Sequence, residues 1–155
     1  MTVVIRPLVK EDANISYKWR NNPEIWKYTG SRPDREITLD IELEWIENVL
    51  HRENEKRFAI LVDNVYVGNT QLTSITDESA VFHIFIGDTK YWGKGVASKA
   101  MDLLMNFAKN ELNLEKLILT VNQENKSAVN LYKRKGFVSV GIETKNSFLK
   151  MEKKL

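Results

Sequence analysis

The strongest chemical signal in the sequence is a glycine-rich turn, Trp92-Gly93-Lys94-Gly95-Val96-Ala97. It follows an apolar segment predicted to be a strand and begins a helical pattern, so its first main-chain N–H groups have no partners within the helix. These amides and the positive end of the helix dipole favour a phosphate or diphosphate, to which Lys94 adds charge. An ordinary strand-to-helix turn that happens to contain glycines explains the same residues equally well.

Two familiar nucleotide motifs do not fit this turn. A P-loop has four residues between its first glycine and a Gly-Lys-Ser/Thr sequence, whereas five residues separate Gly87 from Gly93 and Gly95 follows the lysine. A dinucleotide-binding fold carries its glycines in the first strand–helix unit. Here three predicted strands come before the strand–helix unit that contains the glycines, and Ser98 occupies the third glycine position. The spacing therefore argues against both classes.

Composition excludes several other kinds of site. The chain has 155 residues, no Cys and two His, so disulfides, a thiolate nucleophile and Cys- or His-rich metal sites are excluded. The net charge of 23 − 21 = +2 argues against an electrostatic nucleic-acid binder. No apolar run approaches the ~20 residues of a membrane span, and residues 1–12 lack the pattern of a signal peptide. We therefore expect a cytoplasmic protein without metal, membrane or nucleic-acid partners.

The elements that must position the glycine turn follow from hydrophobic periodicity. Asp63-Asn64 between two alternating segments predicts a hairpin. The apolar segment 80–87 predicts a central strand covered on both faces. Strands are expected at 2–6, 57–62, 65–73, 80–87, 116–121, 137–143 and 147–153, the last two joined by a turn at 144–146, and helices at 10–21, 38–51, 93–110 and 125–135, with an irregular segment at 24–37. This order predicts one α/β domain, 1–155, with a mixed sheet.

A second motif lies about thirty residues after the glycine turn. Asn125 is followed after six residues by Tyr132, and the segment closes in Gly136-Phe137. Together with Gly95-Val96-Ala97, this motif resembles the GNAT superfamily of acetyl-CoA-dependent N-acetyltransferases. Trp92 departs from the Gln or Arg of the family's first motif, and this departure is similar to the branch that contains the ribosomal-protein alanine N-acetyltransferases. The stretch 19–24 is similar to the same branch and to related amino-sugar-nucleotide acetyltransferases.

The resemblance implies a mostly antiparallel central sheet of about seven strands flanked by about four helices. It also implies acetyl-CoA as co-substrate, without a metal. Main-chain groups of Phe85 and Ile86 would pair with the pantetheine arm, the amides of 92–97 would hold the diphosphate, and Asn125 would lie beside the pantetheine. Lys135, in the basic run 133–135, would face the nucleotide phosphates, although such a run at a helix C-terminus is usually solvated.

The residues available for chemistry favour direct attack by a bound amine on the thioester, because the chain offers no nucleophile triad. Main-chain N–H groups of the strand at 80–87 are candidates for stabilising the oxyanion. The resemblance makes Tyr132 the acid that protonates the thiolate, and a phenol is protonated at neutral pH. The alternative is a core tyrosine on the helix face that it shares with Ala128 and Leu131.

The general base is less well defined. Many relatives carry a carboxylate on the central strand where Val81 lies here, and His83 shares a strand face with Val81. His83 is therefore the candidate base, titrating near neutrality. A core histidine with a satisfied hydrogen bond, a water relay, and deprotonation of the amine before binding remain alternatives.

The acceptor site is expected in the segment 19–35, which is rich in aromatic and basic side chains. Arg20, Trp26, Tyr28 and Arg32 are the candidates to bind the acceptor, whereas the helical spacing of Trp19 favours the core. The acceptor is a primary amine: a protein N-terminus, an amino-sugar nucleotide or a polyamine. A homodimer is left open.

Two other classes compete with an acetyltransferase. The first is a non-catalytic module of the same fold that binds acyl-CoA or a partner, which the residues at 81 and 92 permit and Tyr132 argues against. The second is an RNA-associated domain, which rests only on Lys126 and the basic run 133–135.

Overall fold

The computed structural model describes residues 1–28, 33–143 and 148–155. Its centre is a seven-stranded sheet in the order β1-β2-β3-β4-β5-β7-β6. Neighbouring strands are antiparallel, except for the parallel pair β4–β5. The strands are β1 (Val3–Pro7), β2 (Lys56–Val62), β3 (Val65–Thr73), β4 (Ser79–Ile86), β5 (Lys116–Asn122), β6 (Val138–Glu143) and β7 (Phe148–Lys154). The predicted mixed, mostly antiparallel sheet is confirmed.

The described residues form five α-helices rather than the four expected. These are α1 (Ala13–Trp19), α2 (Pro23–Trp26), α3 (Leu39–Leu50), α4 (Val96–Asn110) and α5 (Lys126–Arg134), with 3₁₀ turns η1 (Lys10–Asp12) and η2 (Thr89–Tyr91). The additional helix is α2, within the segment expected to be irregular. The Asn22 side chain accepts from the Glu24 N–H at 3.0 Å, and Pro23 takes the first helical position. The Asn-Pro sequence that ends one helix thus begins another.

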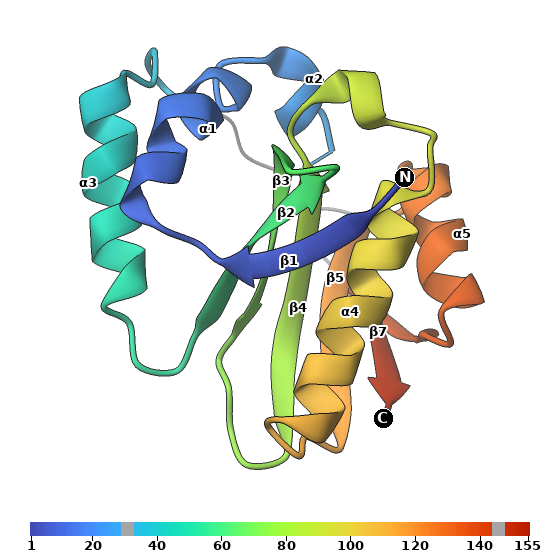
Figure 1. Ribbon diagram of the computed structural model, residues 1–155. Coiled ribbons are helices and arrows are strands. Elements are labelled where there is room, and N and C mark those ends of the chain that lie inside the picture. The colour runs from blue at the N-terminus through green and yellow to red at the C-terminus, as the bar shows by residue number, and fades with distance from the viewer. Residues whose placement is uncertain (29–32, 144–147) are drawn as a thin grey trace.

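The helices form a layer on each side of the sheet. Figure 1 shows α1 and α3 on one side and α4 and α5 on the other. In the first layer, Ala13 and Ile46 pack with Trp19 and Tyr66 in a core cluster. In the second layer, α4 contributes Met101 and Leu104 to a cluster around β4, β5 and β7. None of the helices in the described ranges is long and apolar enough to cross a membrane.

Local turn chemistry agrees with the sequence at the β2–β3 hairpin. Asp63 and Asn64 have φ of +48° and +70°, the conformation that a two-residue hairpin turn requires. The turn expected at 144–146 lies outside the described residues.

The cover of β4 differs from the expectation. Phe82 and Ile86 are buried, but on the opposite face Val81 and Phe85 are only half-buried and His83 is exposed. The expectation of cover on both faces is wrong because the core cluster beneath α1 and α3 draws its strand residues mainly from β2 and β3 and includes only Phe85 of β4. A wholly apolar strand pattern cannot distinguish a covered face from one that borders an open site.

Candidate active site

The centre of the candidate site is the place where β4 and β5 separate. Their pairing comprises three positions and ends at Val81 and Ile118. Beyond it β4 continues to Ile86 and β5 to Asn122. Main-chain groups on this part of β4 have no partner strand on the β5 side, so they form an edge inside the sheet. Such an edge can bind an extended ligand through main-chain hydrogen bonds.

The alternation of β4 fixes which groups face this internal edge. The Gly87 N–H donates to the Val67 carbonyl of β3 at 2.8 Å. Because successive residues of a strand point to opposite edges, Phe85 faces β3, and Ile84 and Ile86 face the edge. Pairing with the pantetheine arm was expected at Phe85 and Ile86. The main-chain groups of Ile86 face the internal edge as this pairing requires, but those of Phe85 do not, and Ile84 faces the edge in its place.

The Phe85 side chain takes part in packing instead. Its ring lies 6.1 Å from that of Trp19 in an edge-to-face arrangement. Trp19, 8% exposed, is a core residue, as its helical spacing indicated. Its ring also covers Gly87, where an added Cβ would lie 2.1 Å from the indole. Helix α1 is thus packed against the end of β4 through the Trp19 ring.

The glycine turn forms an open cradle before α4. Gly93 and Gly95 have φ of +72° and +81°, and an added Cβ at either would meet nothing within 4 Å. Gly95 is the N-cap and provides no side-chain hydrogen bond. Consequently α4 begins at Val96, three residues later than predicted. The first amides of the helix are left without a capping side chain, and the open space in front of the glycines fits a diphosphate.

The flanking side chains of the turn have distinct positions. Val96 is 1% exposed and anchors the helix start in the core, with Ala97 packed against the same cluster. The Lys94 ammonium lies 5.8 Å from the centre of the Tyr91 ring. Trp92 is 44% exposed, and its indole Nε1 donates to the Ile86 carbonyl at 2.8 Å.

Asn125 and Lys135, the residues that flank α5 and were expected near the cofactor, both have structural partners. The Asn125 side chain accepts from the Ala128 N–H at 3.3 Å and caps α5. The Lys135 ammonium bonds to the Asp102 carboxylate of α4 at 2.8 Å, and its side chain is 17% exposed. Lys135 therefore links the two helices rather than standing in solvent.

Tyr132 lies beside the point where the strands part. Its ring is 6.3 Å from Phe82 of β4 and 6.1 Å from Phe137, with edge-to-face and tilted geometry. Burial raises the pKa of the phenol to about 12. No hydrogen bond to the hydroxyl is found within the described residues. The ring is packed as a core residue would be, and its hydroxyl keeps its proton.

His83 lies on the other face of β4, because it alternates with Phe82. Its Nε2 is 3.0 Å from the Thr73 hydroxyl. Desolvation, followed by the nearby Arg57 guanidinium, lowers the pKa of the imidazole, and Glu55 opposes this shift. His83 is thus neutral at pH 7. Tyr132 and His83 are separated by the sheet and approach one another only through the gap between β4 and β5.

The predicted acceptor residues are not gathered in one place. Arg20 is held by Glu42, whose carboxylate is 3.0 Å from the guanidinium, and it lies 4.9 Å from the Trp45 ring. Trp26 and Tyr28 are half-buried at α2, with the Lys27 ammonium 5.4 Å from the centre of the Tyr28 ring. Arg32 lies outside the described residues.

Sequence reasoning missed the buried carboxylate that holds Arg20. Glu42 is 1% exposed and also accepts from the Ser16 hydroxyl at 2.7 Å. A signal for its burial exists, since Glu42, Ile46 and Val49 fall at i, i+4 and i+7 on one helix face. A carboxylate on an apolar face requires a buried partner.

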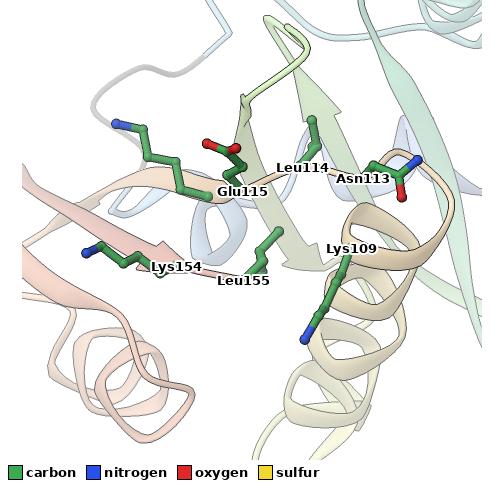
Figure 2. A pocket seen from close by; sticks show the side chains of 7 residues that line it. Lys109, Asn113, Leu114, Glu115, Lys154 and Leu155 are labelled. Atoms are coloured by element: carbon green, nitrogen blue, oxygen red, sulfur yellow. The ribbon is translucent and has the colours of Figure 1, made fainter.

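A surface hollow lies at the far end of the sheet, where α4 ends and β5 begins. Figure 2 shows the side chains of Lys109 and Lys154 fanning outward from the hollow around Leu114 and Leu155, so its cations do not converge on one point. The hollow lies at the start of β5, whereas the gap between β4 and β5 opens after their three paired positions. Among the described residues, no three His, Asp or Glu side chains form a group able to hold a metal ion.

Comparisons with known proteins agree with this geometry. The model of the acetyltransferase (GNAT) domain matches residues 2–138. Spermidine N(1)-acetyltransferase of Escherichia coli K12 is 32% identical over 88% of this chain and 73% of its own length. Acetyltransferase PseH of Campylobacter jejuni is 27% identical over 84% of this chain and 79% of its own.

A solved structure adds the fold. Spermidine N-acetyltransferase from Vibrio cholerae, in complex with CoA and spermine, superimposes with a TM-score of 0.88 at 26% identity and covers 98% of this chain and 95% of its own. The predicted acetyl-CoA-dependent N-acetyltransferase activity is confirmed over the non-catalytic alternative. The chain belongs to the GNAT acetyltransferase family.

Proposed function

We propose that this enzyme acetylates a primary amine of a polyamine. The observation that carries the proposal is the 32% identity to a spermidine acetyltransferase combined with the charge of the α1–α3 layer. Helix α3 contains four carboxylates and no basic residue. A polyamine is a multiple cation at neutral pH, and clustered carboxylates raise its local concentration.

The charges around this layer support the same acceptor. The two arginines near Trp45 are paired, Arg20 with Glu42 at 3.0 Å and Arg57 with Glu55 at 2.7 Å. Their positive charge is therefore offset locally. Exposed carboxylates remain at the start of α3 and just before it, at Asp34, Glu36 and Asp40. These carboxylates are the groups we assign to attract the cationic acceptor.

The proposed cofactor site follows the internal edge of β4. Acetyl-CoA supplies an activated acyl group as a thioester. The amides of Gly93 to Val96 bind its diphosphate, with Lys94 adding charge, and the edge-facing groups of Ile84 and Ile86 orient its pantetheine arm. Asn125 orders the start of α5, and Lys135 joins α5 to α4, so both act by fixing the helix that carries Tyr132.

The proposed proton transfers use opposite faces of β4. Tyr132 keeps its proton because its pKa is about 12, and it donates that proton to the departing thiolate. His83 is neutral at pH 7 and accepts a proton from the amine on the other face. Trp26 and Tyr28 of the α2 region contribute the apolar walls for the acceptor.

A thiol-release assay tests the acceptor. Purified enzyme with acetyl-CoA is supplied in turn with spermidine, spermine, a peptide with a free N-terminus and a nucleotide-linked amino sugar, and kcat/KM is compared. We expect the polyamines to give the highest values. A higher kcat/KM with the peptide or the amino sugar would refute the polyamine assignment.

The carboxylates provide a matched test. Neutralising Glu36 and Asp40 together, as Gln and Asn, should raise KM for spermidine about threefold at low salt and weaken its salt dependence. Glu111→Gln, an exposed carboxylate at the end of α4, serves as the control. Equal KM values in the two variants would contradict a role for the α3 carboxylates.

A further inference from the structure

The side chain of Trp92 forms a hydrogen bond between the two parts of the proposed cofactor site, the glycine turn and the internal edge of β4. Its indole Nε1 donates to the Ile86 carbonyl at 2.8 Å, six residues back along the chain. Ile86 is one of the residues whose main-chain groups face the gap between β4 and β5. The indole itself is 44% exposed, so core packing alone does not explain its position. The hydrogen bond fixes the ring against the strand.

The segment between these residues is already bonded to itself and to β3. The N–H groups of Gly87 and Asp88 both donate to the Val67 carbonyl, at 2.8 and 3.0 Å. The Asp88 side chain accepts from the Lys90 N–H at 3.1 Å, and the Tyr91 N–H donates to the Asp88 carbonyl at 3.0 Å. Trp92 then closes the segment onto β4, so that the glycine turn begins at a fixed place relative to the strand edge.

We propose that Trp92 is a positioning residue for acetyl-CoA. Its indole occupies the last main-chain acceptor on the internal edge of β4, and it holds that edge in register with the amides of Gly93 and Gly95. A ligand spanning both parts finds them already aligned, which lowers the cost of ordering on binding.

The same hydrogen bond determines which main-chain donors and acceptors of the internal edge remain for a ligand. The Ile86 carbonyl is used by the indole, so the pantetheine arm is left with the N–H groups of Ile84 and Ile86 as donors and the Ile84 carbonyl as acceptor. The edge thus presents two donors and one acceptor in a fixed order. This inference rests on the proposed cofactor site and goes beyond the binding of the diphosphate by main-chain amides.

The test is Trp92→Phe, which keeps an aromatic ring and removes the N–H donor. The dissociation constant of CoA, measured by calorimetry without acceptor, should rise about fivefold, as expected for the loss of one hydrogen bond. The KM for acetyl-CoA should rise in parallel, while kcat at saturating acetyl-CoA stays within about twofold. Amide hydrogen exchange at 93–96 should become faster. Unchanged CoA affinity or unchanged exchange would overturn the inference.

A matched control separates this effect from the general loss of an indole. Trp45→Phe changes a half-buried tryptophan on α3, far from the glycine turn along the chain, and should leave the affinity for CoA unaltered. An equal loss of affinity in both variants would overturn the assignment. Because the readout is CoA binding alone, the result does not depend on which amine the enzyme acetylates.

A measurement on the unaltered enzyme stands independently of how the variant folds. In NMR spectra the Trp92 indole N–H should exchange slowly with solvent, despite the exposure of the ring, and its resonance should shift when CoA is added. Exchange as fast as that of a free indole would contradict the hydrogen bond on which the proposal depends.

Discussion

The two halves of the molecule expose different kinds of atoms at the sites proposed for their ligands. Beside α4, the glycine turn and the internal edge of β4 offer main-chain groups, with open space in front of Gly93 and Gly95. Beneath α1 and α3, side chains dominate, and some of the charged ones form ion pairs, as Arg6 does with Asp12 at 2.7 Å and Arg20 with Glu42 at 3.0 Å. One half depends on backbone conformation and the other on the identity of its side chains.

This difference separates what is general from what is particular in the enzyme. Main-chain amides bind a diphosphate whatever the neighbouring side chains are, provided that the glycines hold their conformation. If the α1–α3 layer binds the acceptor, as proposed, single substitutions of its side chains can change the specificity. Ion pairs with a buried carboxylate order that layer, and the exposed carboxylates give it charge.

The largest effect is expected at the boundary between the halves. Tyr132→Phe removes the proposed acid while keeping the ring packed against Phe82 and Phe137, so kcat should fall about a hundredfold. Steady-state kinetics with spermidine and calorimetry with CoA measure the two effects separately. The affinity for CoA should stay the same. A kcat equal to that of the unaltered enzyme would remove Tyr132 from the mechanism.

The second largest effect is expected in the α1–α3 layer, where side chains dominate. Glu42→Gln weakens the bond to Arg20 and one to Ser16 at a site that is 1% exposed, so the free energy of unfolding should fall by about 2 kcal/mol. Urea denaturation measures the change. Glu44→Gln, exposed on the same helix, is the control and should lie within about 0.5 kcal/mol of the original. An equal loss of unfolding free energy in both variants would contradict a stabilising role for the hydrogen bonds of Glu42.

A smaller effect is expected at the glycine turn, where main-chain groups dominate. Gly95→Ala meets no neighbouring atom but must adopt φ of +81°, a strain of about 1 kcal/mol, so CoA affinity should fall about fivefold as the turn relaxes. Lys94→Ala removes a charge without strain and should cost about twofold. Calorimetry with CoA compares the two. A greater loss from Lys94→Ala would show that charge, and not backbone conformation, dominates the cradle.

The last prediction concerns the open face of β4. The pKa of His83 is lowered from its ordinary value of 6.5, so the imidazole is neutral at pH 7 and takes up a proton only as the pH falls below that value. If His83 is the base, as proposed, kcat/KM declines on the acid side of the pH profile. His83→Gln should lower kcat/KM about threefold at pH 7 and flatten the acid limb. An unaltered pH–rate profile would exclude His83 and favour a water relay.

Much of the fold was predictable from the sequence because its signals are local. Alternation, helical spacing and turn residues gave all seven strands to within one or two residues, and Asn125 and Gly136 marked the ends of α5 as N-cap and C′ glycine. The error at α4 has a local cause as well, since the positive φ of Gly93 and Gly95 keeps these residues out of the helix. The helix at Pro23 was missed because proline also marks an end.

The candidate site was predictable only in part. The sequence by itself determined the glycine turn, the spacing from Asn125 to Tyr132 and the family that these motifs indicate. Only the tertiary structure decided that Glu42 meets Arg20 and Ser16, that Trp92 bonds to Ile86, and that Tyr132 and His83 lie on opposite faces of β4. These relations depend on where distant segments dock and on where β4 and β5 part. Local propensities do not encode such long-range contacts, because only the packing of the complete sheet and its two helical layers fixes them.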